Sequence, residues 1–239
     1  MMRKSLFLLI AVLVMIGAQL SADTDENEIS IRFSTLAWDT IKANGIQYLN
    51  GEHVETVRVG QSHMNGPYLY TGPNPIVFFR EKPGLEPGTV IRERVAQAYL
   101  DPQLKEVLFL FTEMPSSSGD LNSPNSMQLN TLVMNHDLGV FPLGSFRIIN
   151  LSQHEVGCIL GDEKLVIPGK QTKLIRSPSN DQADMRVHFS MKIDDQWEPK
   201  INTAWMYHSN KRSLVFLTDV VNARRPYLKM KTISEKGTR

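Results

Sequence analysis

Alternation of apolar and polar residues is most regular in residues 184–194, DMRVHFSMKID. Every second residue from Met185 to Ile193 is apolar, and the residues between them are polar or charged. A period of two lays one face of a strand on a core and the other face in water, as antiparallel sheets allow. Because a slip of one residue would expose every apolar side chain of the run, the pattern predicts a strand with a fixed register.

Three further strands follow one another closely in residues 141–169. The apolar runs 146–149, 156–160 and 164–167 are separated by Gly, Pro, Asn, Asp and Ser residues. These residue types supply turn backbone angles or local side-chain hydrogen bonds. Short strands with turn signals at intervals of about 8–12 residues are typical of a β-sandwich or a β-barrel.

Other apolar or alternating runs predict the remaining strands. They lie at 29–38, 46–49, 54–59, 76–79, 90–100, 106–111, 127–134, 173–175, 203–207, 213–217 and 225–232. Residues 90–100 also fit helical spacing, but the surrounding strands favour a strand. The run 106–111 is almost continuously apolar, so we expect it to be buried on both faces. We expect residues 203–207 and 213–217 to pair as a hairpin.

The chain has 239 residues, enough for two β-sandwiches of about 100 residues each. Pro, Gly, Ser and Asn dominate residues 115–126, which we expect to link two domains or else to form a long surface loop. The predicted fold class is all-β, with two antiparallel, immunoglobulin-like β-sandwich domains at 29–114 and 127–233 and a polar tail at 234–239. The two blocks share no readable repeat motif.

The N-terminal residues 1–22 have the order of a secretory signal peptide. Arg3 and Lys4 precede the apolar run 6–17, and mostly small residues follow up to Ala22. The run is shorter than the ~20 residues that a membrane-spanning helix needs. We expect export, cleavage near Ala22, and a periplasmic or cell-surface mature chain without a transmembrane segment; an uncleaved N-terminal anchor is the alternative.

Composition and net charge bear on the kind of partner that the chain can bind. Hydrophobic residues make up 41% of the chain and the formal net charge is +1. Such a near-neutral globular chain gives no electrostatic reason to expect nucleic acid or an anionic membrane as partner. Cys158 is the only cysteine, so an intramolecular disulfide is impossible, and its apolar strand predicts a small buried side chain.

Motifs for catalysis or metal binding are weak. Residues 60–64, GQSHM, have Met64 where a nucleophile elbow needs its second glycine. The six histidines lack metal-ligand spacing and are expected to be solvated. Asp194 and Asp195 are explained by turn chemistry. The sequence therefore assigns no catalytic, cofactor-binding or metal-binding residues, and no cofactor.

Aromatic residues are the better candidates for binding. Tyr68 and Tyr70 lie in the Pro/Gly-rich segment 66–75, which we expect to be a loop, and loops on a rigid scaffold tend to carry binding. Alternatively, a stacking surface for sugars or peptides could be formed by Trp197, Trp205 and Tyr207. We expect Tyr68 and Tyr70 to contribute to a binding surface.

Residues Gly144-Ser145-Phe146-Arg147-x-x-Asn150, followed by a turn-rich strand pair and Val166-Ile167-Pro168-Gly169, resemble immunoglobulin-like modules of exported bacterial proteins of unknown function. The overall plan is also similar to that of periplasmic pilus-assembly chaperones. Residues 105–110 of this chain loosely resemble a late strand in the first domain of those chaperones. The run here is continuous rather than alternating, and the paired basic residues of that family have no match, so no functional residue is carried over.

These observations support a non-enzymatic accessory or binding protein of the cell envelope whose partner is an envelope protein, a peptide or a glycan. One alternative is a periplasmic chaperone-like adaptor that acts by β-strand addition. A second alternative is a hydrolase whose acidic residues or histidines meet only in the fold.

Overall fold

The computed structural model describes residues 28–38, 42–114, 128–176, 184–220 and 226–237. The expected signal peptide lies outside them. In the described residues the fold is all-β, with 16 strands and no helix. The strands are β1 (Glu28–Trp38), β2 (Gln47–Asn50), β3 (His53–Thr56), β4 (Asn65–Pro73), β5 (Ile76–Pro83), β6 (Val90–Ala98), β7 (Glu106–Glu113), β8 (Leu129–Asn135), β9 (Ser145–Asn150), β10 (Val156–Leu160), β11 (Glu163–Ile167), β12 (Thr172–Arg176), β13 (Asp184–Ile193), β14 (Gln196–Met206), β15 (Lys211–Val220) and β16 (Tyr227–Lys236).

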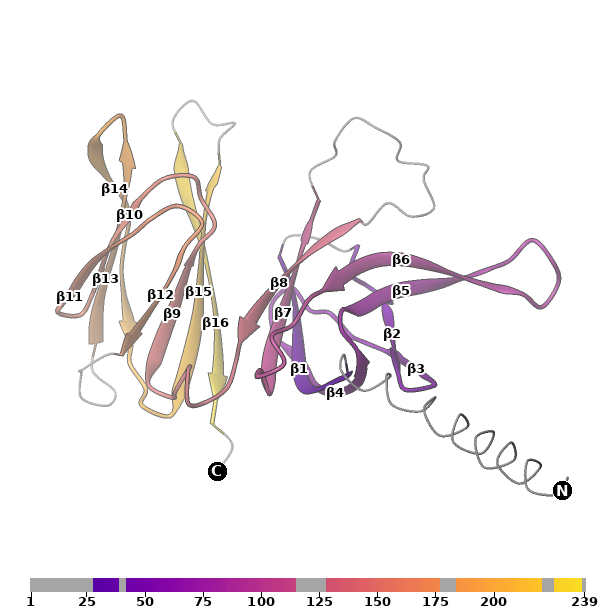
Figure 1. Ribbon diagram of the computed structural model, residues 1–239. Coiled ribbons are helices and arrows are strands. Elements are labelled where there is room, and N and C mark those ends of the chain that lie inside the picture. The colour runs from indigo at the N-terminus through magenta and orange to yellow at the C-terminus, as the bar shows by residue number, and fades with distance from the viewer. Residues whose placement is uncertain (1–27, 39–41, 115–127, 177–183, 221–225, 238–239) are drawn as a thin grey trace, which may run out of the picture.

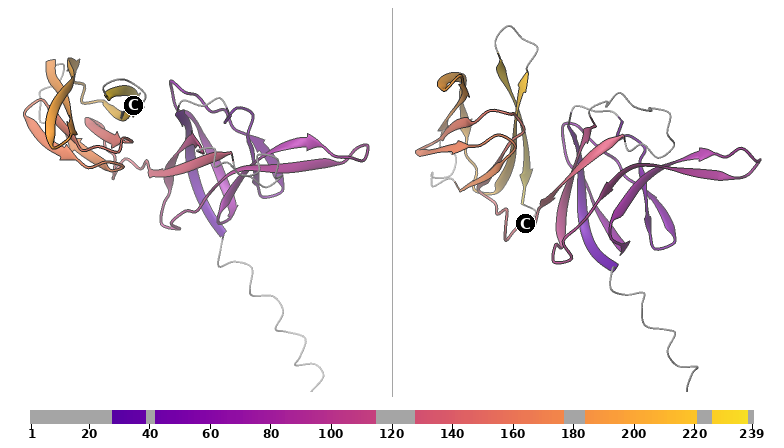
Figure 2. Two further views of the ribbon diagram at one scale, coloured as in Figure 1. Left: turned by 90° about the horizontal axis from the view of Figure 1, so that it is seen from above. Right: turned by 45° about the horizontal axis from the view of Figure 1, so that its top comes forward.

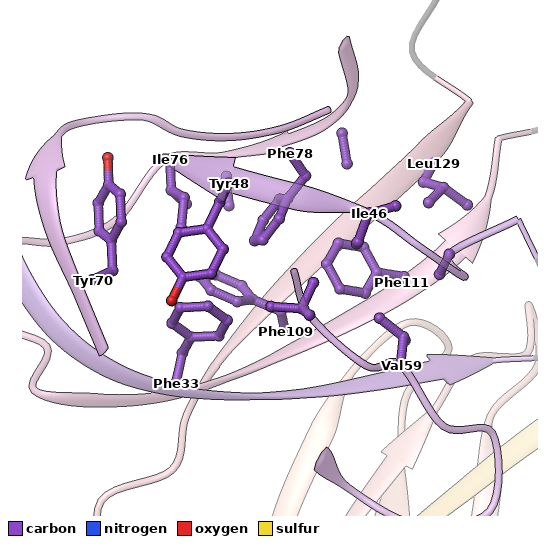
Figure 3. Close-up of a cluster of buried hydrophobic side chains, with 14 of the residues drawn as sticks. Phe33, Ile46, Tyr48, Val59, Tyr70, Ile76, Phe78, Phe109, Phe111 and Leu129 are labelled. Atoms are coloured by element: carbon purple, nitrogen blue, oxygen red, sulfur yellow. The ribbon is translucent and has the colours of Figure 1, made fainter. Parts of the chain in front are cut away.

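Four sheets form two β-sandwiches (Figure 1). The first sandwich packs the sheet β4-β1-β7-β8 on the sheet β3-β2-β5-β6, and the second packs β12-β9-β15-β16 on β11-β10-β13-β14. Each sandwich has its own apolar core. In the first core, shown in Figure 3, the rings of Phe33, Phe78 and Phe109 contact one another.

The two sandwiches have the same topology. Every strand pair of β1–β8 has a counterpart in β9–β16, including the parallel pairs β1–β7 and β9–β15. In each unit the first strand lies between the fourth and the seventh, and the fifth and sixth strands form a hairpin. The chain therefore contains one eight-stranded plan twice, although its halves show no readable sequence repeat.

The first strands of the two units correspond residue by residue. Residues 30–37, SIRFSTLA, and 145–152, SFRIINLS, share a serine, an arginine and a leucine at the same positions. Arg32 lies opposite Leu69 on β4, as Arg147 lies opposite Leu174 on β12. Without the pairing registers, these scattered identities would not mark a repeat.

Strand β8 belongs to the first unit. We expected residue 127 to open the second domain, but β8 pairs antiparallel with β7 from Leu129 to Asn135. The described chain passes between the sandwiches in residues 136–144 instead. Residues 115–126, the expected linker, lie outside the described residues. The strands on either side of them, β7 and β8, are neighbours in one sheet.

Other sequence predictions have mixed outcomes. Residues 90–98 are a strand, as expected. Residues 66–73 are strand and not loop, because β4 completes the edge of the first sheet beside β1. The expected hairpin of 203–207 and 213–217 is wrong, since β14 pairs with β13 while β15 pairs with β9 and β16. Strand β16 also continues to Lys236, into the expected tail.

The continuous apolar run of β7 is buried on both faces, as expected. Val107, Phe109 and Phe111 point into the first core. Leu108 and Leu110 point the other way, into a third apolar cluster that joins the sandwiches. This junction cluster consists of Leu36, Leu108, Leu110, Met134, Phe141, Ile149, Leu214, Phe216 and Ile233. The sheets β4-β1-β7-β8 and β12-β9-β15-β16 therefore face each other, and the molecule has four layers (Figures 1 and 2).

A buried arginine fastens the connecting segment to the second sandwich. Arg212 is 5% exposed; its Nη1 donates to the carbonyl oxygens of His136 at 2.8 Å and Phe141 at 3.0 Å. Its Nε donates to Glu235 Oε2 at 2.6 Å. The guanidinium groups of Arg147 and Arg212 also lie 4.4 and 5.1 Å from the centroid of the Phe141 ring. The connection is thus held at His136 and at Phe141 by charge-assisted and cation–π contacts.

Glu235 is the counter-ion of this junction. Its Oε2 also lies 3.0 Å from His136 Nε2. Burial raises the pKa of the Glu235 carboxyl, but the hydrogen bonds with His136 and Arg212 and their charges outweigh burial and lower the pKa to about 2. His136 is 1% exposed, so the expectation that the histidines are solvated is wrong for this one.

We expect the junction to lose stability in acid. The folded-state pKa of Glu235 lies below the ordinary value of 4.5, so its contribution is complete above that value and is lost as pH falls towards about 2. Glu235→Gln should lower the free energy of unfolding at neutral pH by about 1–2 kcal/mol, a figure reduced for the partial exposure of the carboxylate.

Denaturant unfolding at a series of pH values measures this difference. The gap between Glu235→Gln and the unsubstituted chain should narrow as pH falls. Glu52→Gln, at an exposed position, is the control and should leave no such gap. A gap for Glu235→Gln that stays constant with pH would contradict the assignment of Glu235 as the counter-ion.

Candidate functional site

Tyr68 and Tyr70 face the interior of the first sandwich. Tyr70 is 3% exposed and its hydroxyl donates to the carbonyl of Pro73 at 2.5 Å. Tyr68 packs against the same core, and its hydroxyl accepts from the Arg58 amide at 2.9 Å. Figure 3 shows Tyr70 at the end of the cluster of aromatic rings. Tyr70 is therefore buried and Tyr68 half-buried, because β4 turns both rings towards the core.

The remaining aromatic candidates separate into core and surface. Trp205 packs against the second core, where its ring lies 5.7 Å from that of Phe146. Tyr207 is buried. Trp197, at the start of β14, is 46% exposed. Of the residues considered as stacking groups, Trp197 is the one with a ring available to a ligand.

Trp197 forms one wall of an open hollow of about 530 Å³. The hollow lies on the sheet β11-β10-β13-β14, on the side away from the second core. It is lined by Gly157, Cys158, Ile159, Lys164, Leu165, Val166, His188, Ser190 and Trp197. Gly157 lies opposite Val166 and Ser190 in the two neighbouring strands. Ile159 lies opposite Lys164 and His188 in the same way.

Gly157 lets the indole ring approach the sheet. A Cβ atom at this position would lie 3.3 Å from Trp197 Cζ3 and 3.6 Å from Cε3. A glycine inside a strand often marks such a close approach. The hairpin that carries Trp197 is tight, since Asp194 and Asp195 have positive φ angles of 47° and 62°. The turn chemistry predicted for the aspartates thus brings β14 back with its first tryptophan over the sheet.

Three polar side chains accompany the indole. His188 Nε2 and Ser190 Oγ are 3.0 Å apart on β13. Lys164 lies on β11, one of the edge strands of this sheet. Apolar side chains with a few polar groups among them are typical of a ligand site. The arrangement can stack a flat apolar surface on Trp197 and exchange hydrogen bonds with hydroxyl groups.

The other sequence candidates lie apart from this hollow. Ser62 and His63 are exposed in a bend of the first unit. Cys158 lines the base of the hollow but is buried, and burial raises the pKa of its thiol to about 12. Among the described residues, no group of three or more His, Cys, Asp or Glu side chains could hold a metal ion.

The edge needed for strand addition at residues 105–110 is covered. Strand β7 lies between β1 and β8, so its backbone groups are already paired on both sides. The long edge strand β14 contains Pro199, and its pairing with β13 has an irregular register at Phe189/Ser190. Prolines, bulges and edge lysines oppose pairing with another chain, and the edge strand β16 carries lysines at 229, 231 and 236.

None of the described residues forms a helix that is long and apolar enough to cross a membrane.

No known protein family and no curated protein matches the sequence. Among solved structures, the chain is similar to a protein from Bacteroides uniformis ATCC 8492 described as a "putative cell adhesion protein". The two are 11% identical with a TM-score of 0.23, over 90% of this chain and 100% of that chain. A likeness at this level carries no argument about function, which has to come from the geometry.

We expect the replacement Gly157→Val to displace the Trp197 ring. The added side chain would occupy the space now in contact with the indole, so the ring must turn away from the sheet and become more exposed. The tryptophan emission maximum should shift to longer wavelength, and the shift should be absent when the same change is made in a Trp197→Phe background. Ile159→Val, on the same face without added volume, is the control. An unchanged emission spectrum would contradict the packing of the ring on Gly157.

Proposed function

We propose that the chain is an exported, non-enzymatic binding protein that holds a sugar unit of an envelope glycan in the hollow at Trp197. The observation that carries the proposal is the half-exposed indole, which is in contact with Gly157 beside the side chains of His188 and Ser190. The signal-peptide pattern of residues 1–22 supports the export.

The chemistry of the hollow favours a sugar. One side of a pyranose ring presents C–H groups that pack on an aromatic face, and removing this apolar surface from water favours the contact. Its hydroxyl groups both donate and accept, and His188, Ser190 and Lys164 supply matching partners. The small side chain of Ser190 leaves room for a ring above the sheet.

A peptide fits this place less well. An extended peptide binds by pairing its main chain with a sheet edge, whereas the centre of the hollow lies over β10 and β13, which have neighbours on both sides. Their backbone groups are used within the sheet, so the hollow offers side chains only. That distinction favours a glycan over the peptide and strand-addition alternatives.

The contact between Ser190 and His188 supports a second candidate, a hydrolase. A serine hydroxyl 3.0 Å from an imidazole nitrogen is the first half of a nucleophile–base pair. A triad also needs a carboxylate to orient the imidazole, and the residues that line the hollow include neither Asp nor Glu. Sugar binding is therefore the first proposal. Hydrolysis is the second candidate, and the variants described below distinguish the two.

The test is a titration with oligosaccharides and a pull-down on insoluble polysaccharides, using chitin, cellulose and purified peptidoglycan. We expect at least one of them to bind and Trp197→Ala to weaken it about tenfold or more, equivalent to ~1.4 kcal/mol. Tyr227→Ala, at an exposed aromatic residue on the edge strand β16, should bind as the unsubstituted chain does.

Ser190→Ala separates the two candidates. A binding protein keeps most of its affinity after this change and turns over neither p-nitrophenyl acetate nor an oligosaccharide. Turnover by the unsubstituted chain that disappears in Ser190→Ala would establish the hydrolase instead. Glycan binding that is unaffected by Trp197→Ala, or no binding to any of the three polysaccharides, would overturn the proposal.

A further inference from the structure

The hairpin of β5 and β6 extends well beyond the first sandwich (Figures 1 and 2). Strand β2 pairs with β5 only at Gln47 and Phe79, and β6 is an edge strand. Residues 80–94, which we call the arm, therefore form a two-stranded ribbon. A register irregularity at Phe78/Phe79 lies where the arm leaves the sandwich, and such bulges bend and twist a strand pair.

The outer end of the arm carries exposed apolar side chains on both faces and in the turn. Pro83 and Val90 are opposite one another on one face, and Ile91 lies on the other face. Leu85, in the turn, is fully exposed, while Val90 and Ile91 are 60% and 52% exposed. A flat partner surface would cover one of these faces and leave the other in water. An apolar medium that surrounds the tip would cover all of them.

The base of the arm is charged and internally paired. Lys82 Nζ lies 2.6 Å from Glu93 Oε2, and Arg92 Nε lies 3.1 Å from Glu81 Oε1. With Arg80 and Arg94, the base holds four basic residues against two acidic ones. The near-neutral charge of the whole chain conceals this local excess of positive charge.

The arm is held together by its own hydrogen bonds and ion pairs. The Gly84 amide donates to the Thr89 carbonyl at 2.8 Å, and the Thr89 hydroxyl donates to the Glu86 carbonyl at 2.7 Å. An isolated two-stranded hairpin is marginally stable in water at best, and the cross-strand ion pairs add to its support. These contacts hold the apolar tip in one shape, which lowers the ordering cost of binding.

We propose that the arm attaches the protein to an anionic lipid surface, with its apolar tip among the outer acyl chains and its basic base at the phosphates. From Arg92 to the turn the strand advances about 10 Å at ~3.3 Å per residue. Interfacial segments bury apolar groups to a depth of about 5–10 Å. Glu86, the acidic residue of the tip, limits insertion to this shallow depth because its carboxylate must stay at the level of the headgroups.

Co-sedimentation with vesicles tests the proposal. The chain from Asp23 onwards keeps all the described residues and lacks the apolar run 6–17, which would itself bind lipid. It should sediment with vesicles of equimolar phosphatidylethanolamine and phosphatidylglycerol, less with phosphatidylcholine, and less again at high salt. Leu85→Asp and Ile91→Asp should each weaken binding at least about tenfold, because one buried leucine or isoleucine side chain is worth that factor or more.

Leu69→Asp is the matched control, since Leu69 is 66% exposed on β4, outside the arm; it should bind as the unsubstituted chain does. Leu85→Cys labelled with an environment-sensitive fluorophore provides a second readout, because Cys158 is buried. Its emission should shift to shorter wavelength with vesicles, and that of labelled Leu69→Cys should not. No sedimentation, sedimentation equal in Leu85→Asp and the control, or self-association through the tip without lipid binding would each overturn the proposal.

Discussion

The structure depends on two sheets that are buried on both faces. Strand β7 places Phe109 in the first core and Leu110 in the junction cluster, and β15 places Leu217 in the second core and Phe216 in the junction cluster. Most antiparallel sheets leave one face to solvent; here each of these sheets is the covering layer of the other. Since Trp38 also contacts Phe216 across the junction, with ring centroids 5.3 Å apart, neither sandwich could expose this face without a large apolar patch.

Polar contacts then define how the two halves are connected. A buried arginine is costly unless its donors are satisfied, and Arg212 satisfies them with two carbonyls of the connecting segment and with Glu235. The apolar cluster buries surface but does not orient the sandwiches, because apolar contacts are non-directional. These hydrogen bonds, in contrast, fix one position of residues 136–141 on the second sandwich. Glu235 lies in β16, so the last strand helps to hold the connecting segment 136–141 in place.

Sequence patterns predicted the strands well where the spacing of apolar residues indicates which faces of the strand are buried. The strict alternation of β13 and the continuous apolar run of β7 both have the burial they indicate. The failures lie where local composition and long-range pairing disagree. Prolines and glycines made residues 66–73 look like a loop, but β1 pairs with them and turns Tyr68 and Tyr70 inwards. The hollow could not be predicted, because Gly157 and Trp197 meet only through the register of β10, β13 and β14. Gly157 inside a strand was the one local signal.

The shared topology explains where the two proposed surfaces lie. The sheets containing β1 and β9 are covered on both faces, by a core and by the junction cluster. Only the outer sheets, which contain β5 and β13, have a face that is not packed in a core or in the junction. The hairpin of the fifth and sixth strands differs between the two units. Between β13 and β14 it is a tight turn that sets Trp197 over Gly157; between β5 and β6 it is the projecting arm with Leu85 at its end. Because the two outer sheets lie on opposite sides of the four-layer stack, a ligand in the hollow and a surface at the arm would not compete for the same space.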